Sequence, residues 1–135
     1  MILNAAQLEQ LVAQARADAP NETCGLIGGK EGRALQIYPL KNVDDNPNIR
    51  YLADPQELLH AIRDVEENHD WQVLSIYHSH PASPAYPSPT DVARAFYPDA
   101  VYILISLRNP HMVDVRGYEI KDEVIHEVTL EIVEE

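Results

Sequence analysis

The sequence is short of cysteine, of basic residues and of long apolar runs, and each shortage excludes a class of protein. A single cysteine, Cys24, excludes an internal disulfide and is typical of a reducing compartment. Ten basic residues against 22 acidic ones give a formal charge of −12, which argues against binding to nucleic-acid phosphates. No apolar run approaches the roughly 18 residues of a membrane span, and the first residues lack the layout of a signal peptide. We therefore expect a cytoplasmic protein that binds neither nucleic acid nor membrane.

The length and the hydrophobic pattern predict one α/β or α+β domain over residues 1–135. This length suffices to bury about two-thirds of the unfolded surface, and no repeat or linker divides the chain. Asn4 with Gln7, and Asp54 with Glu57, are spaced as capping boxes that begin helices. Gly29 to Gly32 predicts a turn between two strands, and not a phosphate-binding loop, because no Gly-Lys-Ser/Thr follows. We expect one mixed sheet flanked by helices, with helices after residues 4, 54 and 88 and strands near residues 24–29, 34–40, 71–77, 101–107, 112–120 and 124–132.

Two histidines follow the apolar strand predicted at residues 71–77. In a strand alternate side chains share a face, so His78 and His80 project together and Ser79 projects away. Their Cα atoms would lie roughly 6.5 Å apart, which lets both rings reach one ion at Zn–N distances of about 2.0–2.1 Å. The spacing thus predicts two ligands of a metal site.

A third ligand is available at Asp91, after the loop of residues 81–87. Two histidines and one carboxylate leave a coordination position for water, which is the pattern of a catalytic zinc and not of a structural one. Such a ligand set also suits iron or manganese, so the sequence alone leaves the metal open.

Simpler interpretations of these residues remain open. Ser88 followed by Pro89 and Asp91 is a good helix start, with Ser as N-cap and Pro at the first helical position. The two histidines could likewise form a hydrogen-bonded structural pair. Capping and catalysis are compatible, because a helix N-terminus can hold both a ligand and a fixed backbone.

The complete pattern resembles the JAMM family of zinc-dependent peptidases and isopeptidases, also called the MPN-plus domain. That pattern is a Glu ahead of a Cys-Gly strand start, then His-x-His, seven residues, Ser, two residues and Asp. Glu22, His78, His80, Ser88 and Asp91 occupy these places, and the resemblance extends over nearly the whole chain. It implies a curved, mostly antiparallel sheet of cytidine-deaminase-like architecture, with the metal at one edge between the long helices.

The resemblance also implies a role for each residue. His78, His80 and Asp91 would hold one catalytic Zn²⁺, Glu22 would act as general base, and Ser88 would donate its hydroxyl to the oxyanion. The substrate implied is an amide or isopeptide bond at the C-terminal Gly-Gly tail of a ubiquitin-like or sulfur-carrier protein. Two alternatives are a non-catalytic scaffold that keeps the fold, and a peptidase that acts on phage-tail or cell-wall peptides.

Several other residues receive a default or no assignment. Cys24 has no Cys-x-x-Cys partner, so a buried structural thiol is the better interpretation. His60, His69, His111 and His126 lack ligand spacing and are expected at the surface or in the core. The loop residues Arg50, Tyr51 and Tyr86 are candidates for the border of the cleft. The sequence leaves open the oligomeric state, a homodimer included, and the identity of the protein substrate.

Overall fold

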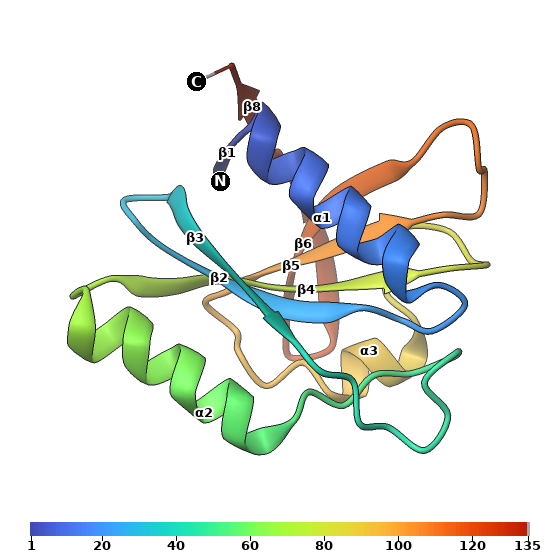
Figure 1. Ribbon diagram of the computed structural model, residues 1–135, viewed down its shortest axis with the longest axis horizontal. Coiled ribbons are helices and arrows are strands. Elements are labelled where there is room, and N and C mark those ends of the chain that lie inside the picture. Colours follow the sequence, from blue (N-terminus) through green and yellow to red (C-terminus); the bar gives the residue numbers. More distant parts are fainter. Residues whose placement is uncertain (135) are drawn as a thin grey trace.

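The computed structural model describes residues 1–134, which form one eight-stranded sheet packed between helices (Figure 1). The strands and helices, in chain order, are β1 (Ile2–Asn4), α1 (Ala5–Asp18), β2 (Cys24–Lys30), β3 (Arg33–Leu40), α2 (Pro55–Arg63), the π-helical turn η1 (Asp64–Asn68), β4 (Gln72–His80), α3 (Pro89–Ala93), β5 (Val101–Ser106), β6 (Asp114–Lys121), β7 (Val124–Val128) and β8 (Glu131–Val133). None of the helices within residues 1–134 combines the length and the apolar character that crossing a membrane requires.

The sheet has the strand order β7-β6-β5-β4-β2-β3-β1-β8 and mixes both pairing directions. The β2–β3, β2–β4, β5–β6 and β6–β7 pairs are antiparallel, whereas β4–β5 and the two pairs of β1 are parallel. The expectation of a mixed, mostly antiparallel sheet with helices is therefore confirmed.

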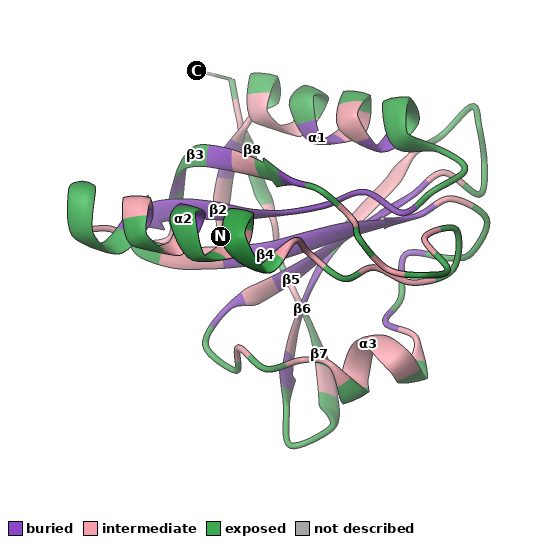
Figure 2. Cartoon of the chain, turned by 60° about the horizontal axis from the view of Figure 1, so that its bottom comes forward, coloured by how far each residue is buried: buried purple, intermediate pink, exposed green. Residues whose placement is uncertain are grey.

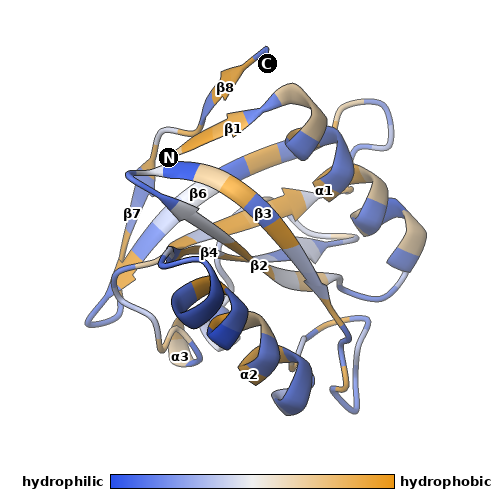
Figure 3. Cartoon of the chain, turned by 60° about the vertical axis from the view of Figure 1, so that its left-hand side comes forward, coloured by the Kyte–Doolittle hydropathy of each residue, from blue (hydrophilic) through white to orange (hydrophobic). Residues whose placement is uncertain are grey.

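Helices cover both faces of the sheet, so the protein has two hydrophobic clusters. Helix α1 lies over one face, and α2 and α3 lie over the other (Figure 1). Alternation along β4 and β5 divides the core: Tyr77 and Ile103 pack on the α1 side, whereas Ile76 and Leu104 pack on the α2 side. The central strands are accordingly buried while the helices expose their outer surfaces (Figure 2), and hydrophobic residues run along several of the strands (Figure 3).

The two ends of the described chain contain the main departures from the predicted elements. The strand expected over residues 124–132 is two strands, and β8 pairs with the unpredicted strand β1 at the opposite edge of the sheet from β7. Three-residue strands leave almost no periodicity to detect. In the middle of the chain, the helix expected after residue 88 is short: α3 ends at Ala93, because the backbone of Arg94 leaves the helix with φ −101° and ψ 12°.

Local signals elsewhere are confirmed. Asn4 and Gln7 form a reciprocal capping box at α1, and the Asp54 side chain accepts from two amides at the start of α2. Glu31 and Gly32 both have positive φ, at 54° and 78°, as a tight two-residue turn between β2 and β3 requires. Gly25 is required for a different reason, since a Cβ there would lie 2.2 Å from the Tyr77 ring.

Candidate metal centre

The two histidines lie at the C-terminal end of β4, a central strand, and on the face of the sheet that α3 covers. Their Nε2 atoms are 3.2 Å apart, and the Asp91 carboxylate completes a triangle with Oδ1 3.1 Å from His78 Nε2 and Oδ2 3.0 Å from His80 Nε2. The expected edge position is thus the edge formed by the strand ends, and not the side of an outermost strand.

The size of this triangle matches the coordination sphere of one small divalent ion. Ligand atoms about 2.0–2.1 Å from a tetrahedral ion are roughly 3.3 Å apart. The observed separations of 3.0–3.2 Å are close to that value, and all three residues are nearly buried. Three ligand atoms that converge in a nearly buried place are better suited to binding a metal ion than to hydrogen bonding with one another.

A backbone carbonyl beside the site sets the tautomer of His80. Its Nδ1 lies 2.8 Å from the Pro84 carbonyl oxygen, which can only accept, so Nδ1 carries the proton and Nε2 presents its lone pair to the site. The neighbouring carbonyls are held in the same way, because Ser106 Oγ donates to the Ser83 oxygen at 2.6 Å and the Tyr118 hydroxyl donates to the Ala85 oxygen. The carbonyls of residues 83, 84 and 85 are therefore bound by side chains from β5, β4 and β6, respectively.

Asp91 is fixed by the helix that carries it. The Ser88 amide donates to Asp91 Oδ2 at 2.8 Å, and the Asp91 amide donates to Ser88 Oγ at 3.1 Å, which is a complete capping box. Burial opposes the charge of this carboxylate, but the close approach of the His78 and His80 rings and the hydrogen bond from the Ser88 amide outweigh it and hold the pKa of Asp91 well below its usual range. Asp91 is thus an anion at neutral pH, as a ligand must be.

Glu22 lies beside this triangle, just before β2. It forms with His78 and His80 a group whose ligand atoms all lie within 4.8 Å of one another. Its side chain is buried, and among the described residues its Oε1 has no hydrogen-bond partner. Burial raises the pKa of Glu22 to about 7, against the attraction of His80. A carboxylate with a pKa near neutrality and a free oxygen beside a metal site is suited to proton transfer through a bound water.

Ser79 faces away from the metal site, as predicted, and the structure gives it a contact that the sequence did not suggest. Its Oγ accepts from the Thr23 amide at 2.8 Å, and its own amide donates to the Thr23 carbonyl at 3.1 Å. Both residues are fully buried. The residue between the two histidines therefore holds the residue directly after Glu22.

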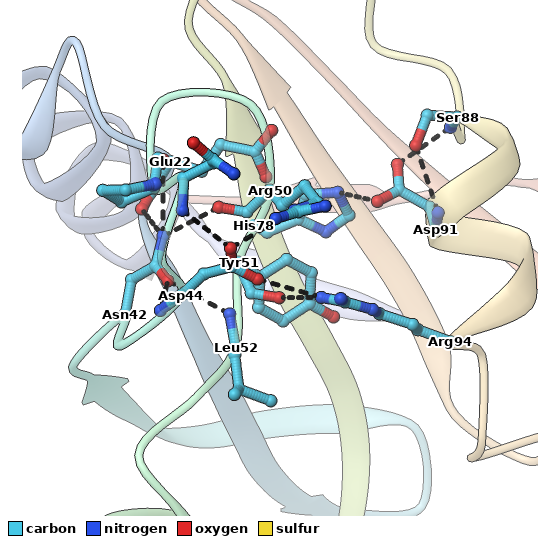
Figure 4. A network of polar contacts seen from close by, with 12 residues as sticks. Glu22, Asn42, Asp44, Arg50, Tyr51, Leu52, His78, Ser88, Asp91 and Arg94 are labelled. Carbon is cyan, nitrogen blue, oxygen red and sulfur yellow. Dashed lines mark hydrogen bonds and ion pairs between the residues drawn. The ribbon is translucent and has the colours of Figure 1, made fainter.

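The loop of residues 41–54, between β3 and α2, covers the site from the other side. Sequence analysis placed Arg50 and Tyr51 of this loop at the border of the cleft but missed Asn42 and Asp44. Figure 4 shows Asn42 and Asp44 of this loop between Glu22 and Arg94, the residue after α3. The Tyr51 ring stacks on His78 with centroids 4.6 Å apart. For Asn42 and Asp44 the only signal in the sequence is the polar composition of the loop, which does not specify their hydrogen-bond partners.

The remaining candidates are distributed as follows. Tyr51 borders the site, and Arg50 lies in the same loop with its Nε 3.2 Å from Asp44 Oδ1. Tyr86 is exposed and packs edge-to-face on Tyr118. Cys24 is buried with its Sγ 3.5 Å from the Leu40 carbonyl, in keeping with a structural thiol. Within residues 1–134 none of the other four histidines joins a cluster of metal-ligating side chains.

Comparison with known proteins agrees with this arrangement. The sequence profile of the prokaryotic homologs of the JAB domain matches residues 4–120. The chain belongs to this family. The resemblance to JAMM proteins is therefore confirmed, and with it a hydrolase of metallopeptidase character with a candidate metal site.

Individual relatives match all or most of the chain. The CysO-cysteine peptidase of Mycobacterium tuberculosis is 39% identical over 137 residues, covering 100% of this chain and 92% of its own. The desampylase of Haloferax volcanii is 36% identical over 94 residues, covering 68% of this chain and 67% of its own. A solved protein from Desulfitobacterium hafniense superimposes with a TM-score of 0.89 at 38% identity, covering 100% of this chain and 94% of that one.

Proposed function

We propose that the protein is a zinc-dependent metallopeptidase that hydrolyses an amide or isopeptide bond at the C-terminal Gly-Gly tail of a ubiquitin-like or sulfur-carrier protein. The observation that carries the proposal is the buried triangle of His78, His80 and Asp91 beside the unpartnered carboxylate oxygen of Glu22. A purely structural site would leave no buried general base beside its ligands.

The residues divide the chemistry between them. When bound, zinc lowers the pKa of a water from about 15.7 to near 7 and polarises the scissile carbonyl. Glu22 takes the proton from the attacking water and passes it to the departing amine. Ser88 donates its hydroxyl to the oxyanion of the tetrahedral intermediate, while its amide keeps Asp91 oriented.

The substrate class is supported by the relatives and by the size of the chain. The names of two relatives specify a CysO-cysteine peptidase and a desampylase, and the first is matched over the full length of this chain. Only the short helix α3 and residues 94–100 separate Asp91 from β5, so no long insertion there is available to grip a large substrate. A small carrier protein bound mainly through its extended tail suits such a surface.

Two further proposals rest on composition. One is that residues 1–135 act as a single domain, and the other is that the protein works in the cytoplasm, where its lone cysteine stays reduced. The scaffold alternative is disfavoured because Glu22 and all three ligands are retained. The alternative of a peptidase for phage-tail or cell-wall peptides would use the same metal-site residues and differs from our proposal only in its substrate.

Intact-mass spectrometry tests the proposal directly. The zinc-loaded protein is incubated with small ubiquitin-like and sulfur-carrier proteins that are extended beyond Gly-Gly, with Glu22→Gln as the blank. We expect a loss of mass that leaves Gly-Gly as the new C-terminus and that is absent from the blank. Binding of one zinc with no cleavage of any such protein would overturn the substrate assignment and favour another peptide or a scaffold.

A further inference from the structure

The 41–54 loop is organised by one side chain that uses its full hydrogen-bonding capacity. Asn42 Nδ2 donates to the carbonyl oxygens of Glu22 and Arg50, each at 3.0 Å, and its Oδ1 accepts from the amides of Asp44 and Leu52, each at 3.0 Å. The Glu22 amide in turn donates to the Pro47 carbonyl at 2.7 Å. The backbone of Glu22 is thus bound on both its polar groups by this loop.

The far side of the loop is bound by two arginines that converge on Asp44. Asp44 Oδ1 accepts from Arg50 Nε at 3.2 Å and from the Asn46 amide at 2.9 Å, and Oδ2 accepts from Arg94 Nη1 at 3.1 Å. Only 5% of the Asp44 side chain is exposed, so these contacts are shielded from solvent. Two of the ten basic residues of an acidic chain are placed on this one carboxylate.

Arg94 connects this loop to the helix that carries the metal ligand. It is the C-cap of α3, three residues after Asp91, and its Nη1 also donates to the Tyr51 carbonyl at 3.0 Å. The Tyr51 ring lies against His78. In Figure 4 the chain of contacts runs from Glu22 through Asn42 and Asp44 to Arg94, on the side of the site away from Ser88.

We propose that Arg94 is a positioning residue: by binding Asp44 and the Tyr51 carbonyl, it ties the 41–54 loop to α3 and so fixes Glu22 relative to the metal ligands. This inference rests on the proposed function and deepens it. Glu22 and Asp91 are 69 residues apart in sequence and come from different elements. A displacement of about 1 Å between catalytic groups can cost 100-fold in rate, so a tie between them has a direct effect on turnover.

Amide hydrogen exchange tests the tie without reference to activity. In zinc-loaded Arg94→Met the aliphatic stem is kept and the guanidinium is lost. We expect exchange to accelerate at least tenfold at the amides of Asp44, Leu52 and Glu22, whose acceptors lie in or depend on the 41–54 loop, and to stay unchanged in β4 and β5. Unchanged protection at Glu22 and Leu52 would overturn the proposal, whether or not any substrate is cleaved.

Kinetics test whether the tie positions the base. On a cleaved carrier-protein substrate we expect Arg94→Met to lower kcat by roughly 10–100-fold with KM and bound zinc nearly unchanged. Asp44→Asn should lower kcat to a similar extent. The double variant should turn over no more slowly than the slower single variant, because both substitutions break the same Asp44–Arg94 contact. Arg94→Lys should recover part of kcat. A rise in KM alone would contradict the positioning role, and so would a normal kcat combined with accelerated amide exchange in the 41–54 loop.

A matched control is available on β6, two strands away from β4 in the sheet. Arg116 binds two carboxylates, with Nε 2.9 Å from Asp114 and Nη1 3.3 Å from Glu127, on β6 and β7. Arg116→Met removes an ion-paired guanidinium whose partners lie outside the 41–54 loop. It should change neither kcat nor the exchange of the 41–54 loop, and an equal effect of both variants would show that the loss at Arg94 is not specific.

Discussion

The two halves of the metal centre are built in different ways. The ligand half, His78, His80 and Asp91, lies within fourteen residues and is held by a strand end, a short loop and a capping box. The base half is Glu22, whose backbone is held by Pro47 and Asn42, together with the adjacent Thr23, which is held by Ser79; these partners are 20 or more residues away in sequence. The ligand half therefore depends on local geometry, whereas the base half depends on the tertiary structure.

Substitutions in the two halves should therefore affect different properties of the protein. A change in the ligand half should remove the metal, because each ligand is a large share of its coordination sphere. A change in the base half should leave the metal bound and alter only the rate. The four predictions below separate these outcomes.

The largest effect is expected for His80→Ala. It removes a proposed ligand and the side chain that binds the Pro84 carbonyl. Since changes in outer-shell partners alone cost about 10–100-fold in metal affinity, loss of a ligand should cost more than 100-fold. Zinc titration with a competing chelator measures this, and the exposed His126→Ala is the control. Retention of a full zinc equivalent at wild-type affinity would mean that the ligand set is wrong.

Glu22→Gln should separate metal binding from turnover. The amide keeps the volume of the side chain and cannot accept a proton, so we expect zinc stoichiometry and affinity within a few-fold of wild type and a loss of at least 100-fold in kcat. Glu9→Gln, an exposed change on α1, is the matched control. Wild-type turnover in the Glu22 variant would remove the general base from the mechanism, while loss of zinc would make Glu22 a ligand.

Ser88→Ala should affect both halves of the comparison, the stability of the ligand half and the rate. Loss of the N-cap should destabilise the protein by about 1 kcal/mol, and loss of an oxyanion donor should lower kcat by roughly 100–1000-fold. Thermal unfolding and steady-state kinetics measure the two separately. Ser88→Thr keeps the hydroxyl and should restore most of both. A lower Tm with unchanged kcat would limit Ser88 to capping.

The smallest effect concerns Cys24, which lies next to the base half and takes no part in the chemistry. Burial, with smaller contributions from Asp18 and Glu57, raises the pKa of this thiol from 9.0 to about 12. The reactive thiolate should therefore stay scarce in the folded protein until the pH nears 12, whereas the unfolded chain ionises about three pH units lower. At pH 8 to 10, iodoacetamide should label Cys24 much more slowly in the folded protein than in the denatured protein. Equal labelling would place Cys24 at the surface.

The contrast between the two halves also explains what could be predicted. His-x-His on a strand and the Ser88–Asp91 helix start are local patterns, so the sequence alone indicates that these side chains converge. The position of Glu22 required a resemblance to a family, because no local rule brings a residue before β2 to the end of β4. Asn42, Asp44 and Arg94 escaped detection because hydrogen bonds between distant polar residues have no periodicity.

The same reasoning applies to the sheet. Long amphipathic or apolar segments such as β4, β5 and α2 were predicted with few errors, since burial on a regular face determines them. The β1–β8 pair was missed because three residues on each strand are paired through the tertiary fold and not through their own pattern.

The three bound carbonyls of residues 83–85 give a reason for the length of the loop between the two ligand segments. Neighbouring strands lie about 4.8 Å apart, and this loop must reach from β4 toward donors on β5 and β6 before it returns to α3. A chain shortened by one residue could not engage Ser106, His80 and Tyr118 together and still deliver Asp91. The seven residues between His80 and Ser88 are thus a span fixed by the width of the sheet, and insertions or deletions should be tolerated far less here than at the β6–β7 turn.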